Sequence, residues 1–393
     1  MQYYLNKKVN NYTCSQFMNI LHVIPSLSKG GAERITIDIC NTLVAQGHKV
    51  MLLSMSEVNA YSFIKFQFQF RQTYSKVIPS ITGKSVVETE DYEQILDEFM
   101  PDVIHSHLFL AEMLTRYKTR KGIKYITHLH DNMPQFESLH FKKINKQKLT
   151  NFFEKQMMLK RYEQCNNKFV AISKDAFDYF YNNLNSNLKD SIHLLHNAID
   201  YHRFYRGART FHRSDTITYK LVSVGSLVDK KNQQFLVDIL IDLLPLIPNC
   251  HIDVLGDGPN HGRIAEKIKK YNLQDKITLH GNVNNVEEFL HNAHLYIHPA
   301  TYEPFGLVLI EAMAAGLPCV CLDGRGNRDV IEHDKNGYIY KDQNPKQFAQ
   351  SIYQLLNNPS KLQEMSDFSI KYAANFDMPL YINRLLELYK LEN

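Results

Sequence analysis

The stretch from residue 302 to residue 318 constrains the fold of this chain more than any other part of the sequence. A short apolar strand is predicted just before it, and Pro304 keeps the chain that follows out of helix. From Gly306 onward an apolar, alanine-rich run favours a helix, which Gly316 and Pro318 end. The stretch therefore predicts a strand, a loop and a helix in direct succession.

Two glutamates give this stretch its chemical interest. Glu303 falls in the predicted loop and Glu311 in the predicted helix. Gly306 lies where the helix would begin, so free backbone N–H groups there can bind phosphate. Glu311 lies among apolar residues, where a carboxylate needs partners such as the hydroxyl groups of a ribose. The spacing alone is equally compatible with two glutamates that only cap and solvate the helix.

The same residues resemble a known signature. Glu-Pro-Phe-Gly-Leu from Glu303, followed by Glu-Ala-Met-Ala from Glu311, resembles the Glu-x7-Glu motif of the retaining nucleotide-sugar glycosyltransferases of family 4. Enzymes of bacterial capsule, exopolysaccharide and lipopolysaccharide synthesis are similar. The resemblance implies the GT-B fold, an α/β architecture in which two Rossmann-like βαβ domains face each other across a cleft. It also implies transfer with retention of anomeric configuration.

The resemblance assigns roles within the motif as well. It implies that Glu303 is catalytic and holds hydroxyl groups of the donor sugar, and that Glu311 holds the ribose. The donor-binding residues that it implies in this stretch are Glu303, Phe305, Gly306, Leu307 and Glu311.

A glycine turn near the start of the chain adds a second candidate ligand site. A strand is predicted over residues 19–24, a helix runs from the turn to about Ala45, and another strand follows at 50–54. This is the start of a βαβ series, in which ligands bind at the carboxyl end of the first strand. A Gly-Gly turn is also common for packing alone, but the resemblance places Gly30 and Gly31 close to the donor phosphates.

Histidines follow two predicted strands in the first half of the chain. One strand ends in His105 and His107, and the strand over residues 124–129 is followed by His130. Because parallel strands end on one rim of their sheet, we expect these imidazoles to lie close together. Neither a third ligand at zinc spacing nor a cysteine cluster accompanies them, so the sequence predicts no metal site. The resemblance instead implies that His130, in a Thr-x-x-His-Asp context, lies beside the donor sugar as a catalytic residue.

The second half of the chain opens a new βαβ series at residues 219–224. The Gly-Ser-Leu that follows resembles the Gly-Arg-Leu of the family, in which a lysine stands five residues after the arginine. Lys231 occupies the lysine position and is implied to bind the donor diphosphate, whereas Ser226 replaces the arginine. This replacement removes one cation, for which Lys230 or a basic residue of the first domain is the candidate to compensate.

Positive charge is concentrated in one part of the first half. The chain has a net charge of +4, and between Arg116 and Arg161 it has twelve basic residues and three acidic ones. Residues 141–164 predict a helix that fits either an anionic membrane surface or an ordinary solvated helix with one core face, and the sequence leaves both open. Its basic and apolar members are Lys142, Lys143, Lys146, Lys148, Lys155, Lys160, Arg161, Phe152, Phe153, Met157 and Met158.

Composition and the lengths of apolar segments indicate where in the cell the protein is expected. No run of about 18 apolar residues occurs, so no transmembrane helix is expected. The first 18 residues are polar, and the six cysteines are scattered without metal-ligand spacing, as in a reduced cytoplasmic protein. We therefore expect a cytoplasmic protein that also contacts the anionic inner face of the cell membrane. No recognised nucleic-acid-binding motif occurs, so nucleic acid is not an expected partner.

The predicted elements divide the chain into three parts. Residues 1–205 are expected to form an N-terminal, acceptor-binding Rossmann-like domain, and residues 206–376 a C-terminal domain that binds the nucleotide sugar. Residues 377–393 contain a helix with an apolar stripe, which in GT-B proteins crosses back to the first domain. Within the first domain, alternating apolar residues over 63–70 predict one more strand.

These observations favour a glycosyltransferase that moves a sugar from a nucleotide-diphosphate donor, expected to be a UDP-sugar. The expected acceptor is a glycan or lipid-linked glycan of cell-surface polysaccharide synthesis. No cofactor is expected, and because no Asp-x-Asp pair occurs, transfer is expected to be independent of metal ions. Two alternatives stay open. One is a nucleotide-sugar epimerase of the same fold, and the other is a non-catalytic glycosyltransferase-like subunit, which the serine at position 226 favours.

Overall fold

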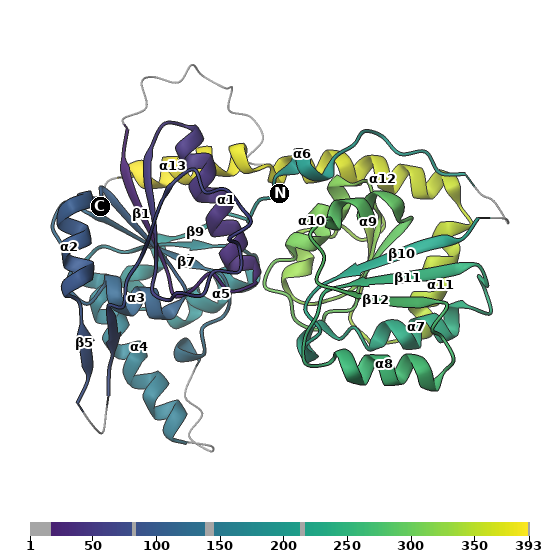
Figure 1. The fold of residues 1–393 in the computed structure, drawn as a ribbon, viewed down its shortest axis with the longest axis horizontal. Coiled ribbons are helices and arrows are strands. Elements are labelled where there is room, and N and C mark those ends of the chain that lie inside the picture. The colour runs from purple at the N-terminus through teal and green to yellow at the C-terminus, as the bar shows by residue number, and fades with distance from the viewer. Residues whose placement is uncertain (1–16, 81–83, 138–144, 213–216, 392–393) are drawn as a thin grey trace.

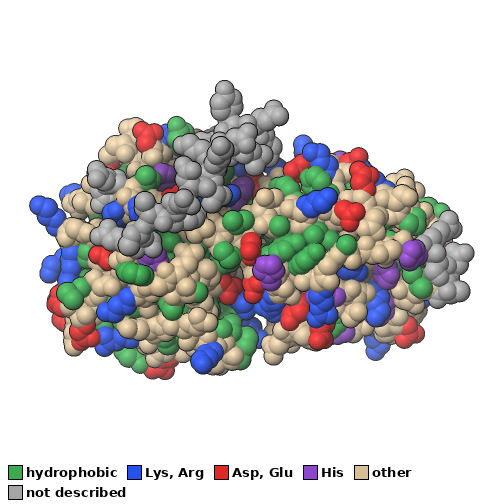
Figure 2. All heavy atoms as spheres, turned by 90° about the horizontal axis from the view of Figure 1, so that it is seen from above, with side chains coloured by type: hydrophobic (Ala, Val, Ile, Leu, Met, Phe, Trp, Pro, Cys, Tyr) green, Lys and Arg blue, Asp and Glu red, His purple; other side chains and the backbone are tan. Residues whose placement is uncertain are grey.

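The computed structural model describes residues 17–80, 84–137, 145–212 and 217–391. Two α/β domains lie side by side, each built on a parallel sheet with helices on its faces (Figure 1). The predicted fold class is thereby confirmed. Figure 2 views the molecule from above, and on this face the basic and acidic side chains of the described residues are interspersed.

The N-terminal domain contains a seven-stranded sheet with the order β3-β2-β1-β6-β7-β8-β9, and all its strand pairs are parallel. Alternate residues of β1 enter two different apolar clusters, one on each face of the sheet, which is why the strand is buried along almost its whole length. The strands are β1 (Asn19–Ile24), β2 (Lys49–Ser54), β3 (Gln69–Gln72), β6 (Val103–His107), β7 (Lys124–Leu129), β8 (Lys168–Ala171) and β9 (Ile192–Leu194). The helices are α1 (Gly31–Ala45), α2 (Glu90–Phe99), α3 (Phe109–Thr115), α4 (Lys146–Gln164) and α5 (Lys174–Asn183), and β4 (Lys76–Ile78) pairs with β5 (Val86–Glu88) in a separate antiparallel ribbon.

The C-terminal domain contains a six-stranded parallel sheet with the order β12-β11-β10-β13-β14-β15. Its strands are β10 (Tyr219–Val224), β11 (Cys250–Leu255), β12 (Ile277–Gly281), β13 (Leu295–His298), β14 (Cys319–Leu322) and β15 (Gly337–Tyr340). Its helices are α7 (Phe235–Leu243), α8 (His261–Lys270), α9 (Val286–Asn292), α10 (Leu307–Ala314), α11 (Pro345–Leu356) and α12 (Pro359–Ala373).

The strand order reverses at β1 in the first sheet and at β10 in the second. Ligands of open parallel sheets bind outside the carboxyl ends of strands at such a reversal. The loops that follow β1 and β6 in the first sheet, and β10 and β13 in the second, are therefore the parts of this fold that are placed to form a site.

Two segments connect the domains. The short helix α6 (Tyr201–Phe204) leads from the first domain to the second, and α13 (Met378–Lys390) returns to the first, where it packs against α1 (Figure 1). At the crossing, the Ile199 amide donates to the Phe376 carbonyl and the Met378 amide to the Ile199 carbonyl, each at 2.9 Å. The buried stripe of α13 shares one apolar cluster with α1, so the final helix is part of the N-terminal core.

The strand predicted over residues 63–70 is wrong, because only Gln69–Gln72 pairs with a neighbour, which is β2. The preceding aromatic residues instead pack from a loop, with the rings of Phe66 and Phe68 stacked at a centroid distance of 4.7 Å. Their alternation reflects contact with the core and with each other rather than a ladder. Among the described residues, no helix combines the length and the apolar character needed to cross a bilayer.

Candidate active site

A cleft of about 400 Å³ lies between the two domains at the carboxyl ends of their strands. The N-terminal domain contributes the start of α1 and the residues after β7, and the C-terminal domain contributes the residues after β10 and β13. The residues that line the cleft are Gly31, Ala32, Glu33, Leu108, His130, Asp131, Ile172, Asn197, Val224, Gly225, Ser226, Lys230, Lys231, Glu303, Pro304, Phe305, Gly306, Leu307 and Val308.

Most residues implied by the sequence motif reach this cleft, and two do not. Gly30 lies behind it, where the Tyr61 hydroxyl donates to its carbonyl at 2.9 Å. Glu311 lies in a separate hollow. Gly31 lines the cleft at the start of α1, and a Cβ built on it would lie 3.8 Å from Cδ1 of Leu307 at the start of α10. The first turns of these two helices therefore approach each other across the domain boundary.

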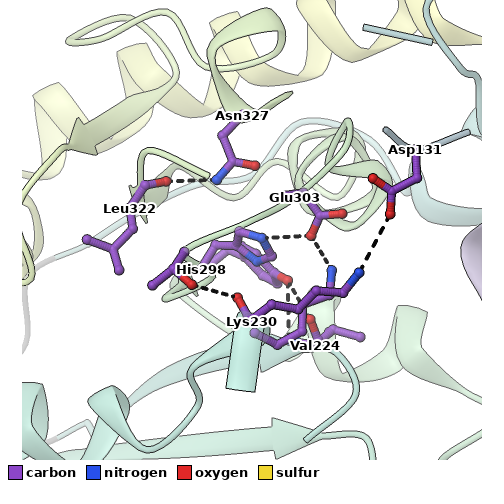
Figure 3. A network of polar contacts seen from close by, with 10 residues as sticks. Asp131, Val224, Lys230, His298, Glu303, Leu322 and Asn327 are labelled. Atoms are coloured by element: carbon purple, nitrogen blue, oxygen red, sulfur yellow. Dashed lines mark hydrogen bonds and ion pairs between the residues drawn. The ribbon is translucent and has the colours of Figure 1, made fainter. Parts of the chain in front are cut away.

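Glu303 is held by two partners within the C-terminal domain (Figure 3). Its Oε2 accepts from the ammonium of Lys231 and from Nε2 of His298, the latter at 3.1 Å. Burial alone would raise the pKa of Glu303, but Lys231 and His298 outweigh burial and lower this pKa to about 2. Glu303 is therefore a carboxylate at neutral pH.

His298 is the member of this group that sequence reasoning did not identify as functional. It is the last residue of β13, is 2% exposed, and stands five positions before Glu303. Burial lowers its pKa, so it is neutral and donates one N–H to the glutamate. Its place at a strand end immediately before the motif was the available signal.

Gly306 is required where α10 begins. Its backbone is left-handed, with φ of 92°, and an added Cβ would lie 2.9 Å from Cδ1 of Leu309. Asn327 lies beside this turn, because its Oδ1 would be 3.2 Å from the same added Cβ, and its side-chain amide donates to the Leu322 carbonyl at 2.7 Å (Figure 3). Leu307 and Val308 line the cleft, and their amides precede the first hydrogen bond of the helix, which runs from the Leu309 amide to the Gly306 carbonyl. These two amides can therefore receive phosphate oxygens.

Asp131 joins the two domains across the mouth of the cleft. It accepts a hydrogen bond from the Tyr302 hydroxyl. Its Oδ2 lies 3.7 Å from Nζ of Lys230 (Figure 3). The Lys230 ammonium also lies 5.4 Å from the centre of the Tyr302 ring. These contacts hold the loop after β7 against the loops after β10 and β13.

Glu311 occupies a hollow of about 60 Å³ that adjoins the cleft at Leu307. Its carboxylate makes no hydrogen bond to any side chain that the structure describes. Burial raises the pKa of Glu311 to about 7, although Arg203 and Arg34 act in the opposite direction. The Glu311 carboxyl group is therefore close to half ionised at neutral pH.

His130 lies at the cleft and is linked to the interior of the first domain. Its Nε2 is 2.8 Å from Nδ1 of His107, which is fully buried. His105 lies close to His107, as expected, with ring centroids 4.7 Å apart. It is not at the strand end, however: it sits in the middle of β6, and its Nδ1 is 2.6 Å from the Tyr389 hydroxyl of α13. Burial lowers the pKa of all three imidazoles, so the N-terminal wall of the cleft presents a neutral histidine.

Comparisons with known proteins agree with this arrangement. The family description "Glycosyltransferase Family 4" matches residues 29–203, and "Glycosyl transferases group 1" matches residues 206–372. Together they account for both domains and for every candidate residue of the cleft. The chain belongs to the GT-B glycosyltransferases.

Individual relatives give the same picture. An uncharacterized glycosyltransferase of Haemophilus influenzae is 22% identical over 92% of this chain and 96% of its own length. The poly(glycerol-phosphate) alpha-glucosyltransferase of Bacillus subtilis is 30% identical over 42% of this chain and 24% of its own length. Among solved structures, Anabaena HepE in complex with UDP and glucose superposes with a TM-score of 0.71 at 17% identity, covering 95% of this chain and 100% of HepE.

The glycosyltransferase has an exposed serine at the position where the resemblance implied an arginine. Ser226 lines the cleft after β10. The two lysines of the same loop also reach the cleft, and each is paired with a carboxylate, Lys231 with Glu303 and Lys230 with Asp131. Among the residues that line the cleft, the cationic side chains of the C-terminal wall are therefore Lys230 and Lys231.

Helix α4 of the glycosyltransferase has two unlike faces. Met158, Leu159 and Tyr162 are buried in the domain core, whereas three apolar residues of its first half are exposed. These are Leu149 (49%), Phe152 (44%) and Phe153 (40%). Lys146 and Lys148 lie on the same half, and Lys142 and Lys143 lie outside the described residues.

Proposed function

We propose that this glycosyltransferase transfers a sugar, with retention of anomeric configuration, from a nucleoside-diphosphate donor to a glycan acceptor. The observation that supports this most is Glu303, an ionised carboxylate held by Lys231 and His298 in the same cleft as His130. A carboxylate in this position can hold sugar hydroxyl groups and stabilise positive charge that develops on the sugar ring.

The proposed reaction breaks the bond between the anomeric carbon and the donor phosphate. The sugar becomes oxocarbenium-like, and negative charge develops on the departing diphosphate. Lys231, Lys230 and the first amides of α10 are placed on the C-terminal wall to offset that charge. Because no Asp-x-Asp pair occurs in the sequence, we propose that these groups act in place of a bound divalent metal ion.

We propose a UDP-sugar as donor, with the ribose at Glu311. The structural relative that carries UDP and glucose supports this choice, and the poly(glycerol-phosphate) alpha-glucosyltransferase supports a cell-surface polymer as acceptor. The proposed acceptor is a glycan or lipid-linked glycan that enters from the N-terminal side, on which His130 lies.

We further propose that the enzyme works on the cytoplasmic face of the membrane, with α4 against anionic lipid. The support is the exposed group of Leu149, Phe152 and Phe153 beside Lys146 and Lys148. Each basic residue near such a surface contributes about 1 kcal/mol, so several give reversible, salt-sensitive attachment.

The test of the transfer proposal is a donor screen. The protein is incubated with labelled UDP-glucose, UDP-N-acetylglucosamine or GDP-mannose, with and without lipid-linked glycan, in EDTA and in Mg²⁺. Transfer to the glycan in EDTA is expected. Conversion of the donor without acceptor would identify an epimerase, binding without turnover would identify a non-catalytic subunit, and activity restored only by Mg²⁺ would overturn metal independence.

The membrane proposal is tested by sedimentation with anionic and neutral vesicles. Wild type is expected to sediment with anionic vesicles at low salt, and a variant with Lys142, Lys143, Lys146 and Lys148 changed to Gln is expected to stay in solution. A matched variant with Lys269, Lys270, Lys341 and Lys346 changed to Gln, all exposed on the other domain, controls for net charge. Equal binding of both variants would overturn the role of α4.

A further inference from the structure

Five histidines gather inside the N-terminal domain, on three adjacent strands. His105 and His107 are two positions apart on β6 and so share one face of the sheet, and His22 of β1 is in register with His105. The ring centroids of these three lie 4.7 to 5.2 Å apart. All three side chains have no solvent exposure. The remaining two members are His128 and His130, on and after β7.

Polar atoms in this cluster lack the partners that burial requires. Nε2 of His22 and Nε2 of His105 are fully buried and have no hydrogen-bond partner among the described residues. Leaving a buried polar group unsatisfied is strongly unfavourable, and native proteins seldom do so. The rings of His22 and His105 are tilted by 32° with centroids 4.9 Å apart, so these two nitrogens lie on neighbouring imidazoles and call for a shared partner.

The opposite ring nitrogens are already oriented by the protein. Nδ1 of His105 is 2.6 Å from the Tyr389 hydroxyl, which leaves Nε2 as the free lone pair. Nδ1 of His107 is 3.2 Å from Oγ1 of Thr36, whose own hydroxyl donates to the Ala32 carbonyl at 2.7 Å, and it also lies 2.8 Å from Nε2 of His130. Histidines that bind metal ions are usually held in this way through their second nitrogen.

We propose that His22, His105 and His107 bind one Zn²⁺ ion beneath α1 and α13. One nitrogen from each can be chosen so that all lie within 4.8 Å of one another. Nε2 of His107 now makes a 2.9 Å hydrogen bond with Nδ1 of His22, and binding of the ion by His107 would replace that hydrogen bond. Nitrogens bound tetrahedrally at about 2.1 Å lie about 3.4 Å apart, so small ring movements complete the site. Three neutral imidazoles form a known type of zinc site.

The ion would act on stability rather than directly on sugar transfer, because it reaches the cleft only through the 2.8 Å contact of its ligand His107 with His130. None of the three ligands lines the cleft, whereas the orienting Tyr389 belongs to the helix that returns from the second domain. Zinc binding would therefore fasten α13 to the N-terminal sheet. A second triple, formed by His107, His128 and His130, meets the same distance criterion, but it uses the histidine that lies at the cleft. Spacing along the sequence predicted no metal site because the third ligand comes from β1, more than eighty residues away.

The test measures metal content and thermal stability in the full chain. The protein is unfolded in urea that contains EDTA, refolded with or without Zn²⁺, and separated from unbound metal by gel filtration. One Zn²⁺ per chain is expected, with Tm raised by about 5 °C or more when Zn²⁺ exceeds its Kd about 100-fold. Refolding with Co²⁺ is expected to give the visible absorption of a tetrahedral nitrogen site.

Variants then locate the site. His22→Asn and His105→Asn are expected to lose both the metal and the Tm shift, whereas His251→Gln in the other domain keeps both. Because a variant could fail to fold, the wild-type stoichiometry and Co²⁺ spectrum stand as independent measurements. Wild type that binds less than about 0.1 ion per chain would overturn the proposal. Loss of metal in His128→Asn with retention in His22→Asn would move the site to the other triple and overturn this assignment.

Discussion

Glu303 and Glu311 are eight residues apart in one motif, both poorly exposed, and their pKa values are displaced in opposite directions. The pKa of Glu303 falls to about 2, whereas that of Glu311 rises to about 7. Burial acts on both in the same sense, since it disfavours the charged form. The difference therefore lies in the partners that each carboxyl group meets.

Those partners differ in availability rather than in number. Lys231 and His298 bind Glu303 directly. Around Glu311 the two nearby cations are already engaged, because Arg34 pairs with Asp38 at 2.8 Å and Arg203 with Glu287 at 3.0 Å. A cation that is committed elsewhere does little to offset burial. The glutamate that would hold the transferred sugar is thus fixed in charge, and the one that would hold the ribose is left open to its ligand.

The largest effect is expected for Glu303→Gln. We expect kcat to fall by about 100-fold or more, because the amide keeps the shape but loses the charge that stabilises the sugar in the transition state. The Kd for UDP, measured by calorimetry, should change less than threefold. Glu332→Gln, a glutamate of the same domain outside the cleft, serves as control. Weakened UDP binding with unchanged kcat would contradict the proposal that Glu303 acts in sugar transfer and Glu311 in nucleotide binding.

Lys231→Met is expected to have the next largest effect. It leaves the Glu303 carboxylate with His298 as its remaining partner, and we expect the free energy of unfolding to fall by about 2–3 kcal/mol. The double variant with Glu303→Gln should recover part of this loss. The neighbouring Lys230→Met is the matched control, because its pair with Asp131 is longer and half-exposed and should contribute less than about 1 kcal/mol. Urea unfolding measures all three, and equal losses for the two lysines would contradict the assignment.

Glu311→Ala is expected to act on binding alone. Loss of hydrogen bonds from ribose hydroxyls to a charged acceptor should weaken UDP binding by about 1–2 kcal/mol, or about tenfold, with kcat for bound donor nearly unchanged. The comparison of UDP with uracil and with 2′-deoxy-UDP would show whether the ribose is the group concerned. An unfolded variant, seen by circular dichroism, would instead favour a purely structural role for this residue.

The smallest expected effect is on the pH dependence of UDP binding. The pKa of Glu311 is raised to about 7, so its carboxyl group is mostly protonated at pH 6 and mostly ionised at pH 8. The ionised form is the stronger acceptor, and we expect UDP to bind about three- to fivefold more tightly at pH 8. Glu311→Gln should abolish that part of the change, whereas titration of UDP itself should persist. The pKa of Glu303 is too low to contribute in this range.

Local signals in the sequence were sufficient for much of the fold. The strand, loop and helix of residues 295–314 follow from an apolar run, Pro304 and the glycines that bound the helix. They failed over residues 63–70, where alternation arose from aromatic packing and not from pairing with a neighbouring strand. The periodicity of apolar residues indicates which side chains are buried. Backbone hydrogen bonding between strands depends instead on which segment of the chain lies alongside.

The sequence by itself indicated most of the predicted residues that reach the cleft after β7, β10 and β13, because a short motif on a parallel sheet places its side chains at one edge. It did not indicate that Glu311 lies outside the cleft. Only the tertiary structure decided the charge states of these side chains and the partners that they meet. His298 became a partner of Glu303 through the turn between them, and Glu311 was separated into its own hollow by Leu307. His22 met His105 and His107 through pairing of β1 with β6. Charge state and ligand geometry depend on neighbours that are distant along the chain, and a linear pattern does not contain them.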